Sequence, residues 1–318
     1  MTMVEIRHED FHREAVALDT RMINDAIIKT LGAIENRGKL PPAVIRRARL
    51  EGRGPFPLPP ESTIAATHEI DGAHGPVKVR IYQTTDAPAG VYLHLHGGGW
   101  TLGSPRENDG ANDQIVARTG WAVVSVQYRL APEHPYPAAP DDCEAAALWL
   151  ADQAQARFGT ARLAIGGESA GANLAVATLV RLRERHGLTP FAGAMLNAGC
   201  FDLRLTPSAR RFGDTPLVLN TEDIQRFVSN YLSAGADVAS ADISPLLADL
   251  TGLPPALFVV GTRDPLMDDT LFMSARWIAA GNRADLMVAP GGCHVFTHFP
   301  GTLTDRAMAR FETFLAGL

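Results

Sequence analysis

The sequence predicts an α/β protein whose mainly parallel central sheet is covered by helices on both faces. Short runs of apolar or β-branched residues recur along the chain, and helical segments lie between or after most of them. Hydrophobic residues make up 46% of the 318 residues, which is ample for a large buried core. The 29 glycines and 22 prolines indicate the many sharp turns that such an alternation needs.

Seven strands and several long helices follow from this pattern. The expected strands are residues 77–82, 91–95, 122–127, 163–166, 192–196, 256–260 and 285–289, and the expected helices include residues 141–156, 170–185, 268–280 and 302–315. The strands are continuously apolar rather than alternating, which is typical of a parallel sheet buried on both faces.

The N-terminal residues 1–50 form a separate helical segment in this interpretation. A helix over 9–35 is expected, with an apolar stripe at helical spacing, and a second helix over 41–50 begins at two prolines. The expected stripe consists of Phe11, Ala15, Leu18, Met22 and Ala26. The proline- and glycine-rich residues 52–60 then lead into the main domain, which comprises residues 51–201 and 246–318.

Residues 202–245 are too long for a simple crossover between two strands, and insertions of this size are usually functional. They contain a predicted helix with Asn220 as its N-cap and Asp223 in its first turn. We expect this insertion to combine with residues 1–50 into a helical cap.

Charge and composition exclude several classes of partner. The net charge is −6 and no Lys/Arg-rich run occurs, so nucleic acid and anionic membrane surfaces are not expected as partners.

The three cysteines lack the paired spacing that would indicate a disulfide framework. No apolar run approaches the ~18 residues that cross a bilayer. The charged N-terminus lacks a signal sequence, so we expect a cytoplasmic protein.

Residues 167–171 read Gly-Glu-Ser-Ala-Gly, a G-x-S-x-G pentapeptide between an expected strand and an expected helix. A turn this tight lifts the oxygen of Ser169 to the top of the sheet, and the helix N-terminus favours developing negative charge there. A serine hydroxyl needs a base to become nucleophilic. His294 and Asp264 each follow a later strand, in the chain order Ser, Asp, His. Asp268 and Asp269 are rival acids, but both fall in the next helix.

Residues 96–100, His-Gly-Gly-Gly-Trp, follow the strand 91–95 directly. Three successive glycines let the backbone turn its N–H groups toward a ligand, and with the N–H of Ala170 they would form an oxyanion hole. Phosphate binding is the alternative, but Leu102 stands where a dinucleotide loop needs its third glycine, and the G-K-[ST] of a P-loop is absent.

Together these segments resemble the bacterial hormone-sensitive-lipase-like (family IV) esterases of the α/β-hydrolase superfamily. The match includes 96–100, 167–171 with Asn173, 128–142 (Tyr-Arg-Leu-Ala-Pro-Glu-His-Pro-Tyr-Pro-Ala-Ala-Pro-Asp-Asp), 264–266 (Asp-Pro-Leu) and 294–296 (His-Val-Phe). Glu168 and Ala172 depart from the commoner aspartate and glycine.

The resemblance implies an α/β-hydrolase fold with a cap, a homodimer, and hydrolysis of short- to medium-chain acyl esters without a metal or other cofactor. It implies Ser169, Asp264 and His294 as the catalytic residues, and the N–H groups of Gly97, Gly98 and Ala170 as the oxyanion hole. His96 would brace the loop. Another acyl hydrolase, such as an amidase or lactonase, and a non-catalytic receptor on the same fold remain the alternatives.

Four further interpretations concern individual residues or small groups of residues. His8 and His12 have the spacing of a zinc-protease motif, but no third ligand is evident. His94 is expected to be a core or supporting residue. Arg129 and Glu133 are expected to pair beneath the site. Four aromatic residues either line an acyl pocket or pack in the core: Trp100, Phe201, Phe212 and Phe227.

Overall fold

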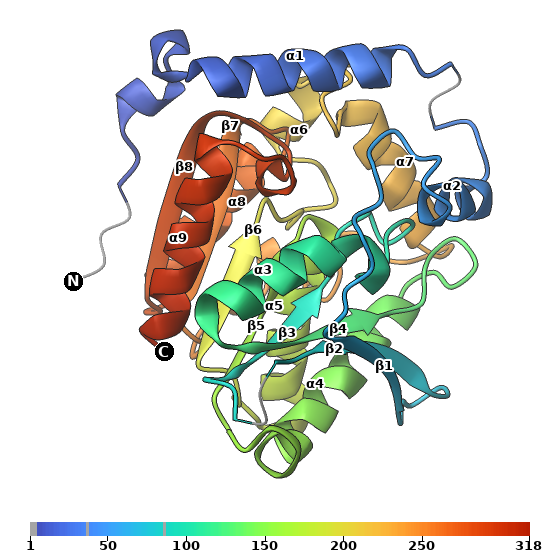
Figure 1. Cartoon of the computed structure of the whole chain (residues 1–318), viewed down its shortest axis with the longest axis vertical. Coiled ribbons are helices and arrows are strands. Elements are labelled where there is room, and N and C mark those ends of the chain that lie inside the picture. The colour runs from blue at the N-terminus through green and yellow to red at the C-terminus, as the bar shows by residue number, and fades with distance from the viewer. Residues whose placement is uncertain (1–4, 36–37, 85–86) are drawn as a thin grey trace.

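The computed structural model describes residues 5–35, 38–84 and 87–318, and these form one eight-stranded sheet flanked by helices (Figure 1). The strand order is β1-β2-β4-β3-β5-β6-β7-β8. The strands are β1 (Ala65–Ile70), β2 (Val77–Tyr82), β3 (Val91–Leu95), β4 (Ala122–Gln127), β5 (Leu163–Glu168), β6 (Gly193–Asn197), β7 (Ala256–Arg263) and β8 (Ala284–Cys293). From β4 to β8 every neighbouring pair is parallel, which confirms the predicted sheet class.

All seven expected strands are present, and one further strand, β1, pairs antiparallel with β2 at the edge of the sheet. The sequence Ala-Ala-Thr-His-Glu-Ile of β1 has little apolar content, and only Ile70 of its residues is buried. An edge strand that is half solvated carries no continuous apolar run, and this is why the sequence pattern did not reveal it.

Helices cover both faces of the sheet, and each face has its own apolar cluster. The cluster on one face includes residues of α4 (Ala138–Phe158), α5 (Ala170–His186) and α8 (Met267–Ala279). The cluster on the other includes residues of α3 (Asp109–Thr119), α9 (Thr302–Ala316) and α1 (Leu18–Gly32). The sequence pattern missed α3, whose first turns contain Gly, Asn and Asp, residues with low helix propensity.

The predicted helix over 9–35 is wrong at its start. Two 3-10 helices, η1 (His8–Phe11) and η2 (Arg13–Ala15), precede α1. The expected apolar stripe faces solvent: Leu18 is 66% and Met22 is 63% exposed. The buried residues of α1 are Thr20, Asn24, Ile27 and Leu31.

Polar anchors explain which face of α1 is buried. The side-chain amide of Asn24 donates to the carbonyl of Gly291 at 2.8 Å, and Asp19 accepts from the backbone N–H of Thr302 at 2.9 Å. These contacts join α1 to residues 267 and 283 positions away, so the orientation of the helix depends on tertiary partners that local periodicity does not contain.

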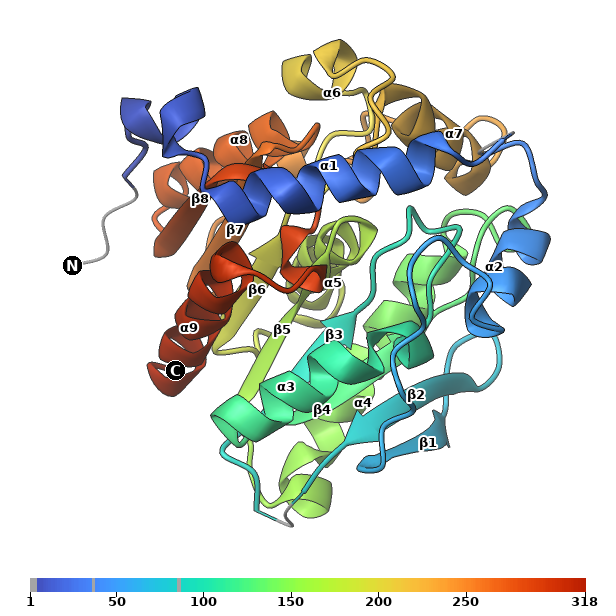
Figure 2. The same ribbon diagram turned by 45° about the horizontal axis from the view of Figure 1, so that its top comes forward.

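The insertion contains α6 (Pro207–Arg211) and α7 (Thr221–Tyr231). Asn220 caps α7 by accepting from the N–H of Asp223 at 2.8 Å, which confirms the predicted N-cap. Figure 2 shows α1, α6 and α7 on the same side of the molecule, beyond the carboxyl ends of the parallel strands, with α2 (Pro42–Leu50) beside them. The remaining 3-10 helices are η3 (Pro105–Asn108), η4 (Pro245–Leu247) and η5 (Phe296–His298).

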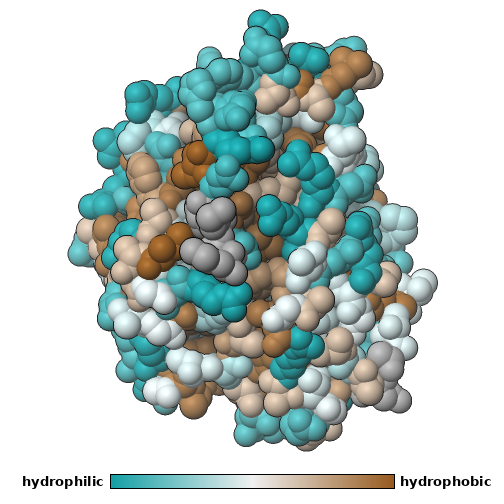
Figure 3. All heavy atoms as spheres, turned by 90° about the vertical axis from the view of Figure 1, so that its left-hand side faces the viewer, coloured by the Kyte–Doolittle hydropathy of each residue, from teal (hydrophilic) through white to brown (hydrophobic). Residues whose placement is uncertain are grey.

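The surface is mainly hydrophilic where it faces the viewer in Figure 3, and apolar side chains there form small groups among polar ones. Within the described part of the chain, no helix is both long and apolar enough to cross a membrane.

Candidate active site

Ser169 occupies the sharp turn between β5, which ends at Glu168, and α5, which begins at Ala170. Its backbone has φ +57° and ψ −119°, a region that non-glycine residues rarely adopt and that marks local strain. A Cβ on either Gly167 or Gly171 would overlap the carbonyl oxygen of Leu95 in the neighbouring strand. The two glycines of the pentapeptide therefore allow the close approach of β3 that this turn requires.

The structure brings Ser169, His294 and Asp264 together at the carboxyl ends of three strands. His294 follows β8 directly and Asp264 follows β7 directly. The Nε2 atom of His294 lies 2.9 Å from Ser169 Oγ, and its Nδ1 atom lies 3.0 Å from each carboxylate oxygen of Asp264. Asp264 also accepts the N–H of Leu266 at 2.8 Å, so its carboxylate is held on two sides. All three residues are buried.

The rival acids Asp268 and Asp269 have other partners. Asp268 accepts the backbone N–H of Ser208 at 2.8 Å. Asp269 accepts the backbone N–H of Asp202 at 2.9 Å and the hydroxyl of Thr206 at 2.6 Å, and it is fully buried. Both carboxylates thus fasten the insertion to α8, and Asp264 alone of the three contacts His294.

The loop 96–100 turns sharply after β3. Gly98 and Gly99 have φ values of +120° and +59°, which glycine adopts readily. The N–H of Gly97 donates to Glu168 Oε1 at 2.7 Å. This bond commits the N–H of Gly97 to a buried carboxylate, which argues against the predicted role of Gly97 as an oxyanion donor. The N–H groups of Gly98 and Gly99 have no acceptor among the described residues.

His96 makes the contacts that are expected of a residue that braces the glycine loop. Its Nδ1–H donates to the carbonyl of Gly97 at 2.8 Å, and its ring stacks on Tyr128 with the centroids 4.1 Å apart. The hydroxyl of Tyr128 donates to the carbonyl of His96 at 2.6 Å. Burial lowers the pKa of His96 to about 4, so the ring is neutral near neutral pH.

The expected pairing of Arg129 with Glu133 is wrong. Arg129 forms a bidentate pair with Asp142, at 2.8 Å from Nη2 to Oδ1 and 3.0 Å from Nε to Oδ2. Glu133 pairs instead with Arg46 of α2. Arg46 also donates to the carbonyl of Thr101 at 2.9 Å, so the N-terminal segment is attached next to the glycine loop.

The four aromatic candidates divide into two pairs. Trp100 and Phe201 are fully buried, and Trp100 stacks on Tyr231 of α7 with ring centroids 4.5 Å apart. These two pack in the core. Phe212 and Phe227 are only partly buried. Phe227 touches the glycine loop, since a Cβ on Gly99 would overlap its ring.

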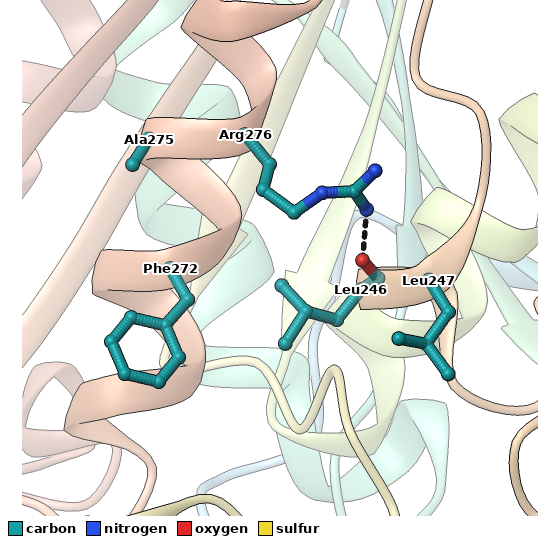
Figure 4. Close-up of a pocket in the computed structure, with 5 residues that line it drawn as sticks. All are labelled: Leu246, Leu247, Phe272, Ala275 and Arg276. Atoms are coloured by element: carbon teal, nitrogen blue, oxygen red, sulfur yellow. Dashed lines mark hydrogen bonds between the residues drawn. The ribbon is translucent and has the colours of Figure 1, made fainter.

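A hollow between η4 and α8 is separate from this site (Figure 4). It is lined by Leu246, Leu247, Phe272, Ala275 and Arg276. The guanidinium of Arg276 donates to the carbonyl of Leu246, across the hollow. None of the residues that the sequence singled out for chemistry lines it.

No group of three or more His, Cys, Asp or Glu side chains is arranged to hold a metal ion within residues 5–35, 38–84 and 87–318. His8 and His12 lie 3.2 Å apart through their Nε2 atoms, but they belong to an exposed 3-10 segment. The α-helical presentation that the zinc-protease motif requires is therefore missing.

The chain is similar to known hydrolases and esterases. Residues 92–298 match a family model described as an alpha/beta hydrolase fold. The esterase LipI of Mycobacterium tuberculosis is 32% identical over 312 residues, which cover 93% of this chain and 96% of LipI. The carboxylesterase NlhH of the same species is 36% identical over 217 residues, which cover 66% of this chain and 67% of NlhH.

Solved structures give the same result. A hyperthermophilic esterase from the archaeon Pyrobaculum calidifontis superposes with a TM-score of 0.83 at 28% identity, over 92% of this chain and 96% of that one. A hormone-sensitive lipase from a metagenome library gives a TM-score of 0.82 at 28% identity, over 94% and 98%.

Fold and site thus define an α/β hydrolase. More narrowly, the chain belongs to the hormone-sensitive-lipase-like (family IV) esterases and is a serine carboxylesterase.

Proposed function

We propose that this carboxylesterase hydrolyses short- to medium-chain acyl esters through an acyl-enzyme formed on Ser169. The observation that carries the proposal is the unbroken line of contacts from Asp264 through His294 to Ser169 Oγ. In this arrangement His294 carries a proton on Nδ1, which it donates to Asp264, so that Nε2 is free to accept the proton of the serine hydroxyl.

The reaction proceeds by double displacement. His294 Nε2 takes the proton of Ser169 as the serine oxygen attacks the ester carbonyl, and the resulting imidazolium is stabilised by Asp264. When the bond to the alcohol oxygen breaks, His294 returns the proton to the leaving alcohol. It then takes a proton from water, the resulting hydroxide attacks the acyl-enzyme, and the proton returns to Ser169 as the acid departs.

The oxyanion hole in this proposal consists of the N–H groups of Gly98, Gly99 and Ala170. Gly98 and Gly99 offer donors without another acceptor in the described chain, unlike Gly97. Ala170 is the first residue of α5, where a backbone N–H has no partner within the helix. Removing one such donor typically raises the transition-state barrier by about 3 kcal/mol.

We also propose that residues 1–50 and 202–245 form a cap over a catalytic domain of residues 51–201 and 246–318. Contacts between the two segments support this division, although residues 1–4 and 36–37 lie outside the described chain. Gly38 lies so close to Arg226 of α7 that a Cβ there would overlap the guanidinium, and Pro216 lies against Gly32. Such a cap would bound the acyl chain. Homodimer formation and a cytoplasmic location stay predictions.

The test is hydrolysis of p-nitrophenyl esters from acetate to palmitate by the wild type and by Ser169→Ala. We expect rates to be highest on the shorter chains and to disappear in the variant, because loss of the nucleophile lowers kcat by roughly 10⁶ in another serine hydrolase. Hydrolysis that survives in Ser169→Ala would refute the proposed nucleophile, and equal rates up to palmitate would refute the chain-length limit.

Asp264→Asn and Asp268→Asn form a matched pair for the acid. Asp264→Asn is expected to lower kcat by about 10⁴ because the amide favours the wrong tautomer of His294. Asp268→Asn, in which only a contact to Ser208 changes, should stay close to the wild type. The reverse order would move the role of the acid to Asp268.

A further inference from the structure

A chain of hydrogen bonds crosses three neighbouring strands beneath the glycine loop. Ser125 of β4 lies opposite His94 of β3, and its Oγ is 2.8 Å from His94 Nδ1. His94 Nε2 lies 3.0 Å from Oε2 of Glu168 at the end of β5. The other oxygen, Glu168 Oε1, accepts the N–H of Gly97. The three side chains are buried, so the chain of contacts is shielded from water.

The chemistry of the groups fixes the direction of the hydrogen bond to the carboxylate. An ionised carboxylate only accepts, so His94 Nε2–H donates to Glu168, while His94 Nδ1 pairs with the hydroxyl of Ser125. Burial raises the pKa of Glu168, but the charge and hydrogen bond of His94, together with His298 and the N–H of Gly97, outweigh burial and hold it at about 2. The carboxyl group of Glu168 is therefore ionised at any pH well above 2.

We propose that Glu168 is a positioning residue for the oxyanion hole. By accepting the N–H of Gly97 it fixes the start of the glycine loop, so that the next two N–H groups, of Gly98 and Gly99, face the substrate oxygen at Ser169. This inference rests on the proposed function and adds to it a group that contacts neither the substrate nor the catalytic histidine.

Close packing supports this role. A Cβ on Gly97 would lie 3.0 Å from the carbonyl oxygen and 3.1 Å from Cγ of Glu168, so the loop rests directly on this residue. At its other end the loop is held by the N–H of Leu102, which donates to the carbonyl of Gly98 at 2.8 Å. Because Glu168 is also the residue before Ser169, one strand end sets the position of both the nucleophile and the loop.

Glu168→Ala and Glu168→Gln separate the acceptor from the charge. Alanine leaves the N–H of Gly97 without its acceptor, so the loop can turn and the oxyanion donors move. Glutamine keeps an oxygen for this N–H, while its amide can donate to His94 if the imidazole takes the other tautomer and donates to Ser125. We expect kcat to fall by about 10² in Glu168→Ala and by less than about 10 in Glu168→Gln, with KM nearly unchanged in both.

The experiment measures kcat and KM on a short-chain p-nitrophenyl ester for the wild type, Ser169→Ala and both Glu168 variants, with melting temperatures alongside. Glu144→Ala is the matched control, because Glu144 is a buried glutamate of α4 that pairs with Arg181 of α5, away from the glycine loop. It should lose stability without a comparable loss of kcat. If Glu168→Gln is as slow as Glu168→Ala, the acceptor role is refuted.

A double-mutant cycle with Gly98→Ala gives a second, independent measure. If Glu168 acts through the oxyanion donors, the loss in the double variant should barely exceed the larger single loss. Fully additive losses would overturn the proposal even when every variant folds. Failure of the proposed function itself would appear separately, as hydrolysis by the wild type that does not depend on Ser169.

Discussion

The ring of Phe227, in α7 of the insertion, packs directly against Gly99 of the glycine loop. A Cβ on Gly99 would overlap the ring, and the backbone there has φ +59°. A side chain of the proposed cap therefore touches the backbone that is proposed to hold the oxyanion. In the proposed arrangement, substrate contacts made by the cap and stabilisation of the transition state would be coupled at this point.

Gly99→Ala is expected to lower kcat/KM by about 10² because the methyl group displaces either the loop or the ring of Phe227. Phe227→Ala removes the aromatic ring that packs against Gly99 without changing the backbone of the loop. It should therefore mainly raise KM and extend the range of acyl chains that are hydrolysed. The matched control is Phe272→Ala on α8, whose ring is exposed in the separate hollow. Wild-type kinetics in Gly99→Ala would contradict the assignment of this N–H.

Arg181 is expected to contribute strongly to stability. Its buried guanidinium donates to Asp141 at 2.9 Å, Glu144 at 3.0 Å and Asp242 at 2.6 Å. Arg181→Ala leaves these carboxylates without their counter-ion, so we expect a loss of roughly 3–5 kcal/mol in the free energy of unfolding. Urea unfolding of this variant and of Arg185→Ala, which removes a half-exposed partner of Glu144, provides the comparison. Equal losses would contradict the argument.

The three proposed catalytic residues could be predicted because each directly follows a strand. Ser169 follows β5, Asp264 follows β7 and His294 follows β8, and parallel neighbouring strands end at the same edge of a sheet. Their meeting point therefore depends on topology alone, which the alternation of apolar strands and helices already indicates.

What the sequence did not predict depends on backbone direction and on distant contacts. Which N–H of the glycine loop points inward depends on φ at Gly98 and on the reach of Glu168, and neither follows from residue types. The glutamate in place of the commoner aspartate was the one available signal. The buried face of α1 was likewise determined by Asn24 and Gly291, which are 267 residues apart.

Stability should depend on pH through Asp269. Burial raises the pKa of this carboxyl from its ordinary 3.8 to about 7, and Asp202 adds to the effect, although bonds from Thr206 and two backbone N–H groups oppose it. Between these values the folded protein keeps a proton that the unfolded chain releases. The stability that the protonated form contributes is therefore fully present below about pH 4 and is lost as the pH rises toward 7.

The measurement is the melting temperature of the wild type minus that of Asp269→Asn, from pH 4.5 to pH 7.5. Asparagine cannot ionise, and the other carboxyls contribute equally to both proteins. The difference should therefore shift against the wild type as the pH rises. A difference that stays constant across this range would show that Asp269 titrates alike in the folded and unfolded states.

Arg46 is expected to hold the N-terminal segment on the catalytic domain. Its guanidinium donates to the carbonyls of Thr101 and Ala131, and it pairs with Glu133. The two carbonyls follow the glycine loop and the start of the 128–142 segment, so α2 is fastened beside the proposed oxyanion hole. Arg46→Ala removes all three contacts, and we expect faster proteolysis near residues 33–55 together with a rise in KM.

Glu133→Ala is the control for this prediction because it removes only the partly exposed ion pair, and exposed pairs contribute about 0–1 kcal/mol. Limited proteolysis, followed by mass spectrometry of the fragments, compares the two variants with the wild type. If Glu133→Ala is cleaved as fast as Arg46→Ala, the ion pair rather than the carbonyl contacts attaches α2. If neither is cleaved faster, α2 is attached through the apolar contacts of the segment, and Arg46 is not what holds it.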